Sequence, residues 1–230
     1  MTSTAILIPA RYESTRFPGK PLCNLGGMSM IQRVHETCAL SGFPTYVLTD
    51  DQRVANAIND RCTVIIDKRD FNNGTERCAA AIETDFLSKY NSFVNVQGDM
   101  PDVNLDMINK MADVARYGLA TAWTDLPASL QSDPNCVKMV HNNFRAHWFG
   151  RGLTMGAHHL GIYGYARDIL EKYGTLIDRY EKNEGLEQLR WLNMGYDIHV
   201  RYTEFFGMEI NTPADMDSWN KRHEDLGDLV

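Results

Sequence analysis

Short apolar runs alternate with amphipathic stretches along most of the chain. The first run, Ala5–Ile8, is long enough for a buried strand, and Ser29–Leu40 then repeats its apolar residues at helical spacing. Tyr46–Leu48 is the next apolar run. Because a strand, a loop, a helix and a second strand form the repeating unit of a parallel sheet, the pattern predicts an α/β fold. We expect three layers, αβα, around a mainly parallel central sheet.

The same pattern continues to the end of the chain. It predicts further strands at Thr63–Ile66, Phe93–Val96, Leu119–Trp123, Val137–Val140, Ala146–Phe149 and Ile198–Tyr202. It predicts further helices at Arg53–Ile58, from the turn Asn72–Arg77 to about Leu87, and at Leu105–Tyr117, Asn183–Met194 and Pro213–His223. Since no repeat, low-complexity tract or linker interrupts this order, we expect a single domain over residues 1–230.

Composition and charge limit the classes of partner. An apolar fraction of 43% with 10% aromatic residues suits a globular enzyme with a sizeable core. The net charge of −7 gives no overall field that would attract nucleic acid or an anionic membrane. Basic residues that bind an anionic ligand must therefore act locally, inside a site. We expect neither nucleic acid nor a membrane as a partner.

The cysteines and the chain's first residues indicate a compartment. The five cysteines are an odd number without a CxxC pair, and they are Cys23, Cys38, Cys62, Cys78 and Cys136. We expect reduced, mostly buried thiols. No apolar run of 18 residues occurs, and no charged segment followed by a long apolar one stands at the beginning. These observations predict a soluble, cytoplasmic protein.

The loop after the first strand carries three cations. Arg11, Arg16 and Lys20 follow Ala5–Ile8, and Gly19 allows a close approach of the backbone to a ligand. Open α/β proteins bind phosphate at the carboxyl ends of their strands, where two arginines clamp oxygens in a bidentate way. The spacing is not that of a Walker loop. A solvated basic turn is the alternative, and the position directly after a strand favours a phosphate site.

Two later segments also place polar groups where a strand ends or a helix begins. Asp99 follows a glycine after the strand Phe93–Val96, a position suited to a hard cation that binds carboxylate and phosphate together. Gly74 and Thr75 begin a predicted helix, whose first N–H groups are free for an anion or a polar base edge. An ordinary helix cap is the alternative for the second segment.

Several motifs resemble one enzyme family. Pro9-Ala10-Arg11-Tyr12, Ser14, Arg16 and Pro18-Gly19-Lys20-Pro21-Leu22 resemble the opening signature of sugar-acid cytidylyltransferases. Gly74–Arg77, Asn95–Asp99, His159–Tyr165 and Glu187–Arg190 extend the resemblance, which is strongest to the 3-deoxy-manno-octulosonate cytidylyltransferase (CMP-Kdo synthetase) family and runs from about residue 5 to about 220. It implies a Rossmann-like nucleotide-diphospho-sugar transferase fold. It also implies Mg²⁺-dependent transfer of CMP from CTP to a 3-deoxy-2-ulosonic acid such as Kdo, with release of pyrophosphate.

The resemblance also assigns roles to residues. The residues implied in catalysis are Arg11, Arg16, Lys20 and Asp99. Those implied in nucleotide binding are Arg11, Ser14, Lys20, Thr75, Arg77 and Gln97. Those implied in binding the acidic sugar are Gln97, Arg151, His159, Tyr163, Glu187 and Gln188. Asp99 is the implied Mg²⁺ ligand.

The sequence departs from the family at the metal site and after Arg151. Asn211 stands where the family has a second metal-binding aspartate, and Glu209 would share a face with it in an extended segment, so we count both as candidate ligands. Only Gly152–His158 separates Arg151 from the next motif, whereas the family has a longer insert that contributes to dimer packing. A homodimer is therefore in doubt. A different sugar acid, or a binding relative that lost catalysis through Asn211, are the alternatives to the main interpretation.

Overall fold

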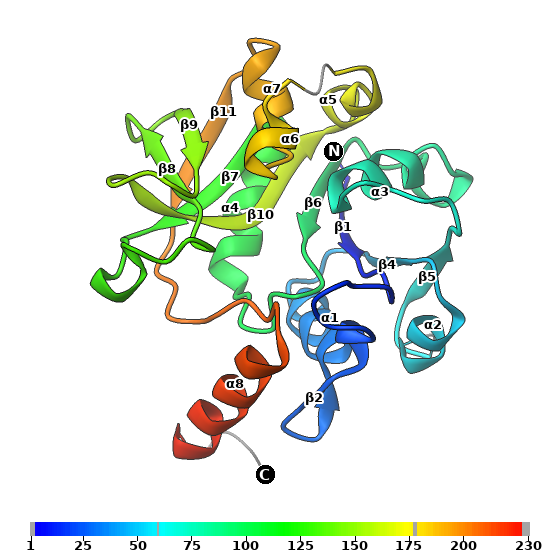
Figure 1. The fold of residues 1–230 in the computed structure, drawn as a ribbon. Coiled ribbons are helices and arrows are strands. Elements are labelled where there is room, and N and C mark those ends of the chain that lie inside the picture. The colour runs from blue at the N-terminus through cyan, green and yellow to red at the C-terminus, as the bar shows by residue number, and fades with distance from the viewer. Residues whose placement is uncertain (1–2, 59, 177–178, 227–230) are drawn as a thin grey trace.

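The computed structural model describes residues 3–58, 60–176 and 179–226, built around one large mixed sheet (Figure 1). Its main strand order is β11-β7-β10-β6-β1-β4-β5. The strands are β1 (Thr4–Pro9), β4 (Thr45–Thr49), β5 (Thr63–Ile66), β6 (Ser92–Val96), β7 (Leu119–Thr124), β8 (Lys138–His141), β9 (Ala146–Gly150), β10 (Ala157–Ala166) and β11 (Ile198–Tyr202). The pairs β1–β4, β1–β6, β4–β5 and β7–β11 are parallel, which confirms the predicted mainly parallel sheet.

Helices cover both faces of this sheet. They are α1 (Met30–Leu40), α2 (Gln52–Ile58), α3 (Gly74–Ala81), α4 (Leu105–Ala115), α5 (Arg167–Leu170), α6 (Glu181–Glu184), α7 (Leu189–Asn193) and α8 (Pro213–Leu226). A small hairpin of β2 (Asn24–Leu25) and β3 (Met28–Ser29) precedes α1, and four short 3-10 turns lie at Lys20–Leu22, Asp85–Leu87, Ala128–Leu130 and Tyr173–Thr175. Helix α8, red in Figure 1, extends from the body and packs against the hairpin.

The alternation of side chains along β1 explains the two helical layers. Ile6 and Ile8 point to the layer that contains α1, α2 and α4, whereas Ala5 and Leu7 point to the layer that contains α3, α5 and α7. All four side chains are fully buried. A parallel strand in the middle of a sheet is apolar on both faces because helices cover both. The predicted three-layer arrangement is confirmed.

The helix expected over Leu105–Tyr117 ends two residues early, at Ala115, and two other predicted helices differ more from the sequence pattern. The helix expected over Asn183–Met194 is two short helices, α6 and α7, because Gly185 between them has a left-handed backbone with φ of 64°. Glycine loses more conformational entropy than other residues when it joins a helix, and in the left-handed conformation it commonly ends one. The helix expected to continue to Leu87 ends at Ala81 and gives way to a separate 3-10 turn.

Strand β10 runs antiparallel to both of its long neighbours, β6 and β7, and also pairs with β8. Its register against β7 shifts between Leu160 and Tyr163, which marks a bulge. Since β10 runs opposite to β6, its early residues lie at the edge where β1, β4 and β6 have their carboxyl ends. The sheet therefore brings the beginning of the His159–Tyr165 motif to the same edge as the cationic loop after β1.

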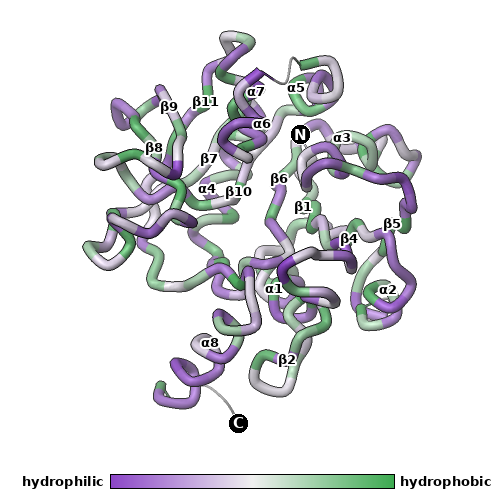
Figure 2. Tube along the Cα trace, in the orientation of Figure 1, coloured by the Kyte–Doolittle hydropathy of each residue, from purple (hydrophilic) through white to green (hydrophobic). Residues whose placement is uncertain are grey.

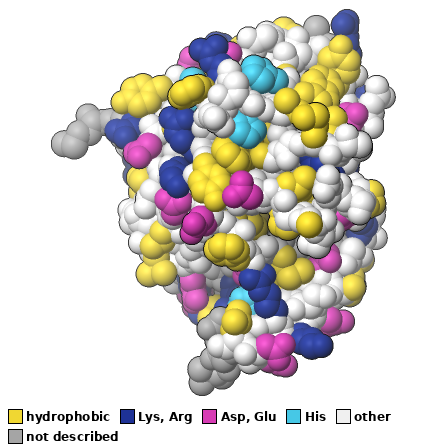
Figure 3. All heavy atoms as spheres, turned by 90° about the vertical axis from the view of Figure 1, so that its left-hand side faces the viewer, with side chains coloured by type: hydrophobic (Ala, Val, Ile, Leu, Met, Phe, Trp, Pro, Cys, Tyr) yellow, Lys and Arg dark blue, Asp and Glu magenta, His cyan; other side chains and the backbone are white. Residues whose placement is uncertain are grey.

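Polar and apolar residues are mixed along the chain in Figure 2 and over the face shown in Figure 3. The loop between β5 and α3 is hydrophilic along most of its length (Figure 2). On the face shown in Figure 3, hydrophobic side chains occur in several groups among histidines and charged residues.

Within the described residues, no helix is long and apolar enough to cross a membrane. All five cysteines are free, and Cys38, Cys78 and Cys136 are buried, as expected.

Candidate active site

Two clefts meet at the carboxyl edge of the central strands. The first has a volume of about 300 Å³ and lies against the loop after β1, and the second has a volume of about 590 Å³ and lies between β10 and the α6–α7 segment. The two clefts share Asn73, Gly74, Gln97 and Asp99. Groups bound in the two clefts would meet at these four residues.

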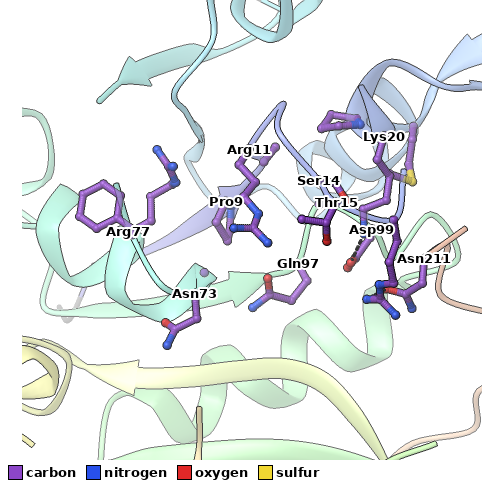
Figure 4. A pocket seen from close by; sticks show the side chains of 17 residues that line it. Pro9, Arg11, Ser14, Thr15, Lys20, Asn73, Arg77, Gln97, Asp99 and Asn211 are labelled. Atoms are coloured by element: carbon purple, nitrogen blue, oxygen red, sulfur yellow. Dashed lines mark hydrogen bonds and ion pairs between the residues drawn. The ribbon is translucent and has the colours of Figure 1, made fainter. Parts of the chain in front are cut away.

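The first cleft is cationic. Arg11, Arg16, Lys20 and Arg77 line it together with Ser14, as the sequence predicted (Figure 4). Arg11 and Arg16 are exposed, whereas Lys20 is half-buried. Guanidinium groups that remain accessible in a cleft fit phosphate oxygens. The cleft is therefore suited to a polyphosphate.

Lys20 holds Asp99 at the junction of the clefts. The Lys20 Nζ lies 2.6 Å from Asp99 Oδ2, and the two side chains are 15% and 26% exposed (Figure 4). Gly98, next to Asp99, leaves no room for a side chain, because a Cβ there would lie 2.9 Å from the Pro9 carbonyl oxygen. The close contact between the two strand ends fixes where the Asp99 carboxylate emerges.

Arg77 is the most enclosed cation of the first cleft. Its guanidinium donates to the Asp67 carbonyl at 3.0 Å and to Asp50 Oδ2 at 3.4 Å, and it lies 4.8 Å from the centre of the Phe71 ring. The sequence predicted Arg77 at the nucleotide but missed Phe71. These contacts fix the guanidinium at the wall of the cleft.

The start of α3 differs from the sequence prediction. Thr75 is fully buried and does not line either cleft within the described residues; its hydroxyl lies 3.2 Å from the Tyr165 hydroxyl. The Thr75 N–H donates to Glu187 Oε2 at 3.2 Å, and the Glu76 N–H donates to the Asn73 side chain at 2.8 Å. The N–H groups that we expected to be free thus have acceptors inside the protein. Thr75 therefore lies beneath the cleft surface, and its contact with a nucleotide stays a prediction.

The second cleft is lined by hydrogen-bonding side chains. The structure brings together five of the residues that the resemblance assigns to sugar binding, and they are Gln97, His159, Tyr163, Glu187 and Gln188. The Tyr163 hydroxyl donates to Gln188 Oε1 at 3.1 Å. The Gln188 Nε2 group is buried and has no hydrogen-bond partner among the residues that the structure describes. Because buried donors without a partner are costly, this amide is a strong candidate for a ligand contact.

Two titratable groups of the second cleft are shifted by burial. Burial raises the pKa of Glu187 to about 7, against the hydrogen bonds from Thr75, which lower it. Burial also lowers the pKa of His159 to about 3, so that its ring is neutral at physiological pH. The His159 Nε2 atom lies 2.9 Å from the Thr121 hydroxyl. His159 therefore presents an uncharged ring to the second cleft. The pKa of the Glu187 carboxyl group lies close to neutral pH.

Arg151 is not brought into the wall of either cleft. Its guanidinium donates to the carbonyl of Asn135, a residue of the second cleft, and this contact turns the side chain along the rim. Lys138 is fully buried beside it, and its Nζ lies 3.3 Å from the Arg151 carbonyl oxygen. The contact of Arg151 with a sugar carboxylate stays a prediction, and the guanidinium retains further N–H donors beside the one that binds Asn135.

The candidate metal ligands lie near one another but do not form a closed cage. Asp99 and Glu209 both line the second cleft. Part of the Glu209 side chain reaches solvent, while burial of its carboxylate and the like charge of Asp99 raise its pKa. The Asn211 amide oxygen accepts a hydrogen bond from Arg16 at 3.1 Å. No group of three or more His, Cys, Asp or Glu side chains suited to a metal occurs in the part of the chain that the structure describes.

Other cleft residues were missed by the sequence analysis. They are Thr15, Phe71, Asn73, Asn135, His158, Glu181 and Arg190. Asn73 carried the clearest signal, since it stands directly before a predicted helix. It caps α3, and its Nδ2 donates to the Tyr173 hydroxyl and to Glu181 Oε1, both at 2.7 Å. Asn73 thereby ties the α6 segment to the junction of the two clefts.

Known proteins of similar sequence are cytidylyltransferases. A family model described as cytidylyltransferase matches residues 5–198. The 8-amino-3,8-dideoxy-manno-octulosonate cytidylyltransferase of Shewanella halifaxensis (strain HAW-EB4) is 38% identical over 234 residues, which cover 93% of this chain and 96% of that protein. The protein of the same name from Shewanella oneidensis is 34% identical over 240 residues, which cover 96% and 98%.

Solved structures agree with these matches. A CMP:2-keto-3-deoxy-manno-octonic acid synthetase complexed with CTP superposes with a TM-score of 0.85 at 31% identity, over 98% of this chain and 100% of that one. A 4-diphosphocytidyl-2C-methyl-D-erythritol synthase from Anaerococcus prevotii shares the fold alone, with a TM-score of 0.66 at 11% identity. The expected Rossmann-like nucleotidyltransferase fold is confirmed. This chain belongs to the cytidylyltransferase family, in the group that resembles the manno-octulosonate enzymes, and it is a nucleotidyltransferase.

Proposed function

We propose that this enzyme transfers CMP from CTP to a 3-deoxy-2-octulosonic acid and releases pyrophosphate. The observation that carries the proposal is the junction of a cationic cleft with a larger, hydrogen-bonding cleft at Asn73, Gly74, Gln97 and Asp99. In this assignment the nucleotide occupies the first cleft and the sugar acid the second. The α-phosphate and the reacting hydroxyl then meet at Gln97 and Asp99.

The reaction is a displacement at phosphorus. The anomeric hydroxyl of the sugar loses its proton to water, and its oxygen forms a bond to the α-phosphorus. The bond from that phosphorus to the bridging oxygen breaks, and pyrophosphate leaves with the electron pair. In this proposal Arg11, Arg16 and Lys20, which line the first cleft, neutralise the charge that develops on the phosphates. Most of the catalysis then comes from positioning two substrates and from fixed charges.

Mg²⁺ is part of this proposal. Asp99 and Glu209 are two carboxylates whose mutual repulsion contributes to the raised pKa of Glu209, an arrangement that a dication relieves. Mg²⁺ often binds through one or two carboxylates together with substrate phosphates, so the absence of a closed cage among the described side chains fits this metal. Asp99 and Glu209 would hold it, and Asn211 would need to release Arg16 to join them. When bound, Mg²⁺ lowers the pKa of a coordinated hydroxyl and neutralises phosphate charge.

The relatives' name suggests that the sugar carries an amino group at C8. The second cleft contains the carboxyl group of Glu187, whose pKa is raised by burial and which accepts a hydrogen bond from the neutral residue Thr75. A carboxylate in such a place is stabilised by a cationic ligand group. We therefore propose an 8-amino-3,8-dideoxy octulosonic acid as the preferred acceptor, with the 8-hydroxy sugar as a weaker one.

Pyrophosphate release from CTP tests the proposal. It is measured with the 8-amino sugar, with the 8-hydroxy sugar Kdo, with a nine-carbon sialic acid and with no sugar. We expect turnover with the two octulosonic acids, a higher kcat/KM for the 8-amino one, and a requirement for a divalent cation that Asp99→Asn abolishes. Turnover with the sialic acid alone would identify a different acceptor, and CTP binding without turnover would identify a binding relative.

A further inference from the structure

The segment 207–212, which we call the strap, carries Glu209 and Asn211 to the site without forming a helix or a strand. It follows β11 and ends where α8 begins at Pro213. A segment without regular backbone hydrogen bonds keeps its side chains in place only if other groups bind its backbone. The contacts of the strap therefore decide where Glu209 and Asn211 lie.

Asp102 supplies the strap's main side-chain anchor. Its Oδ2 accepts the Met208 N–H at 2.9 Å, and its Oδ1 accepts the Trp219 indole N–H at 2.7 Å. The His223 Nε2 lies 3.6 Å from the same Oδ1. Hydrogen bonds to a carboxylate are stronger than those to a neutral acceptor. One carboxylate thus joins the strap to helix α8.

The neighbouring contacts make this anchor rigid. The Ile210 N–H donates to the Asp99 carbonyl at 3.0 Å, so the strap also binds the loop that carries Asp99. Trp219 is 1% exposed and stacks on His223, with the ring centres 3.6 Å apart. A Cβ on Gly207 would lie 2.3 Å from the Cβ of Asp102, so the strap passes closely over this side chain.

We propose that Asp102 is a positioning residue, which holds Glu209 opposite Asp99 by binding the strap to α8. Asp102 lines neither of the two clefts, so it acts through Met208 and not on a ligand. The loop after β6 therefore carries two groups that shape the candidate metal site. One is Asp99, a candidate ligand, and the other is Asp102, which anchors the strap that carries the second candidate ligand, Glu209. The inference deepens the proposed function and rests on it for the role of Glu209.

Hydrogen exchange tests the anchor without any substrate or metal. In the whole protein, Asp102→Asn leaves one amide oxygen for two N–H donors, so exchange in a peptide that contains Met208 should become at least tenfold faster. Trp219→Phe keeps an aromatic ring but removes one donor, and it should have little effect on this peptide's exchange if the carboxylate itself is the anchor. Asp106→Asn is the matched control, because Asp106 accepts from Lys110 and the Thr203 hydroxyl at 2.5 and 2.7 Å but does not bind the strap.

Mn²⁺ binding in the presence of CTP tests the consequence for the site. Free Mn²⁺ is counted by electron paramagnetic resonance, and we expect Asp102→Asn to weaken binding about tenfold while Asp106→Asn leaves it unchanged. Unchanged exchange and unchanged Mn²⁺ binding in Asp102→Asn would overturn the inference, as would equal effects of both variants. If Asp102→Asn does not fold, Asp102→Glu, which keeps the charge but shifts the oxygens, must show the same changes. Wild-type protein that binds Mn²⁺ and CTP but releases no pyrophosphate would contradict the proposed function and leave the anchor standing.

Discussion

The buried carboxyl group of Glu187 makes a quantitative prediction about pH and stability. Its pKa rises from 4.5 to about 7 in the folded protein because burial disfavours the charged form. A group whose pKa is raised by folding stabilises the fold fully below its unfolded pKa, and that contribution is lost as the pH rises through the folded pKa. Glu187 therefore destabilises the protein between about pH 4.5 and 7, and most strongly above pH 7.

Replacing Glu187 by glutamine removes the ionisation but keeps an oxygen for the Thr75 N–H. At about 1.4 kcal/mol for each pH unit between the two pKa values, the variant should be more stable by about 3 kcal/mol at pH 8. At pH 5 the same relation gives less than about 1 kcal/mol. For a chain of this length, about 3 kcal/mol corresponds to an increase in Tm on the order of 6–12 °C.

Thermal and urea unfolding of wild type and Glu187→Gln at pH 5 and pH 8 measure this difference. Glu224→Gln, an exposed position on α8, is the control and should change stability by less than about 0.5 kcal/mol at either pH. An equal gain at both pH values, or no gain at pH 8, would refute the reasoning. The same variant should lose part of the preference for the 8-amino sugar. A buried carboxyl group that lowers the stability of the fold is retained because it binds the ligand.

Three further substitutions test other parts of the structure. Lys20→Met should lower kcat/KM for CTP on the order of 10²–10³-fold, measured by pyrophosphate release, and a wild-type rate would contradict the role of this cation. Gly164→Ala should cost about 1–3 kcal/mol in unfolding experiments, because a Cβ there lies 2.5 Å from the Met111 carbonyl oxygen, and unchanged stability would contradict the close packing of α4 on β10. Gly74→Ala places a Cβ 2.6 Å from the Gln97 amide oxygen, so it should displace that side chain and lower kcat/KM about 10–100-fold with little loss of stability.

The sequence was informative where one local signal decides the structure. Apolar runs located the strands, and β5 and β11 have the bounds that the pattern predicted. Cations directly after β1 lie in one cleft because the carboxyl ends of parallel strands share an edge. The fold class and the cationic half of the site were therefore accessible from the chain alone.

Long-range contacts decided what the sequence could not predict. Whether the N–H of Thr75 is free depends on Glu187, which lies 112 positions further along the chain. The ion pair of Lys20 with Asp99 joins two loops that are 79 positions apart. The direction of the Arg151 side chain depends on a carbonyl group of another loop. None of these contacts produces a local pattern in the sequence from which it could be predicted.

The direction of β10 has a consequence for how this enzyme could change its substrate. Residues that line the first cleft come mainly from loops after β1 and β6, whereas His159 and Tyr163 of the second cleft belong to a strand hydrogen-bonded on both sides. A strand in the middle of a sheet accepts few substitutions or insertions, because each one disturbs two ladders. New sugar preferences should therefore evolve, or be engineered, in the short helices α6 and α7 and the turn between them, with β10 retained as a fixed template.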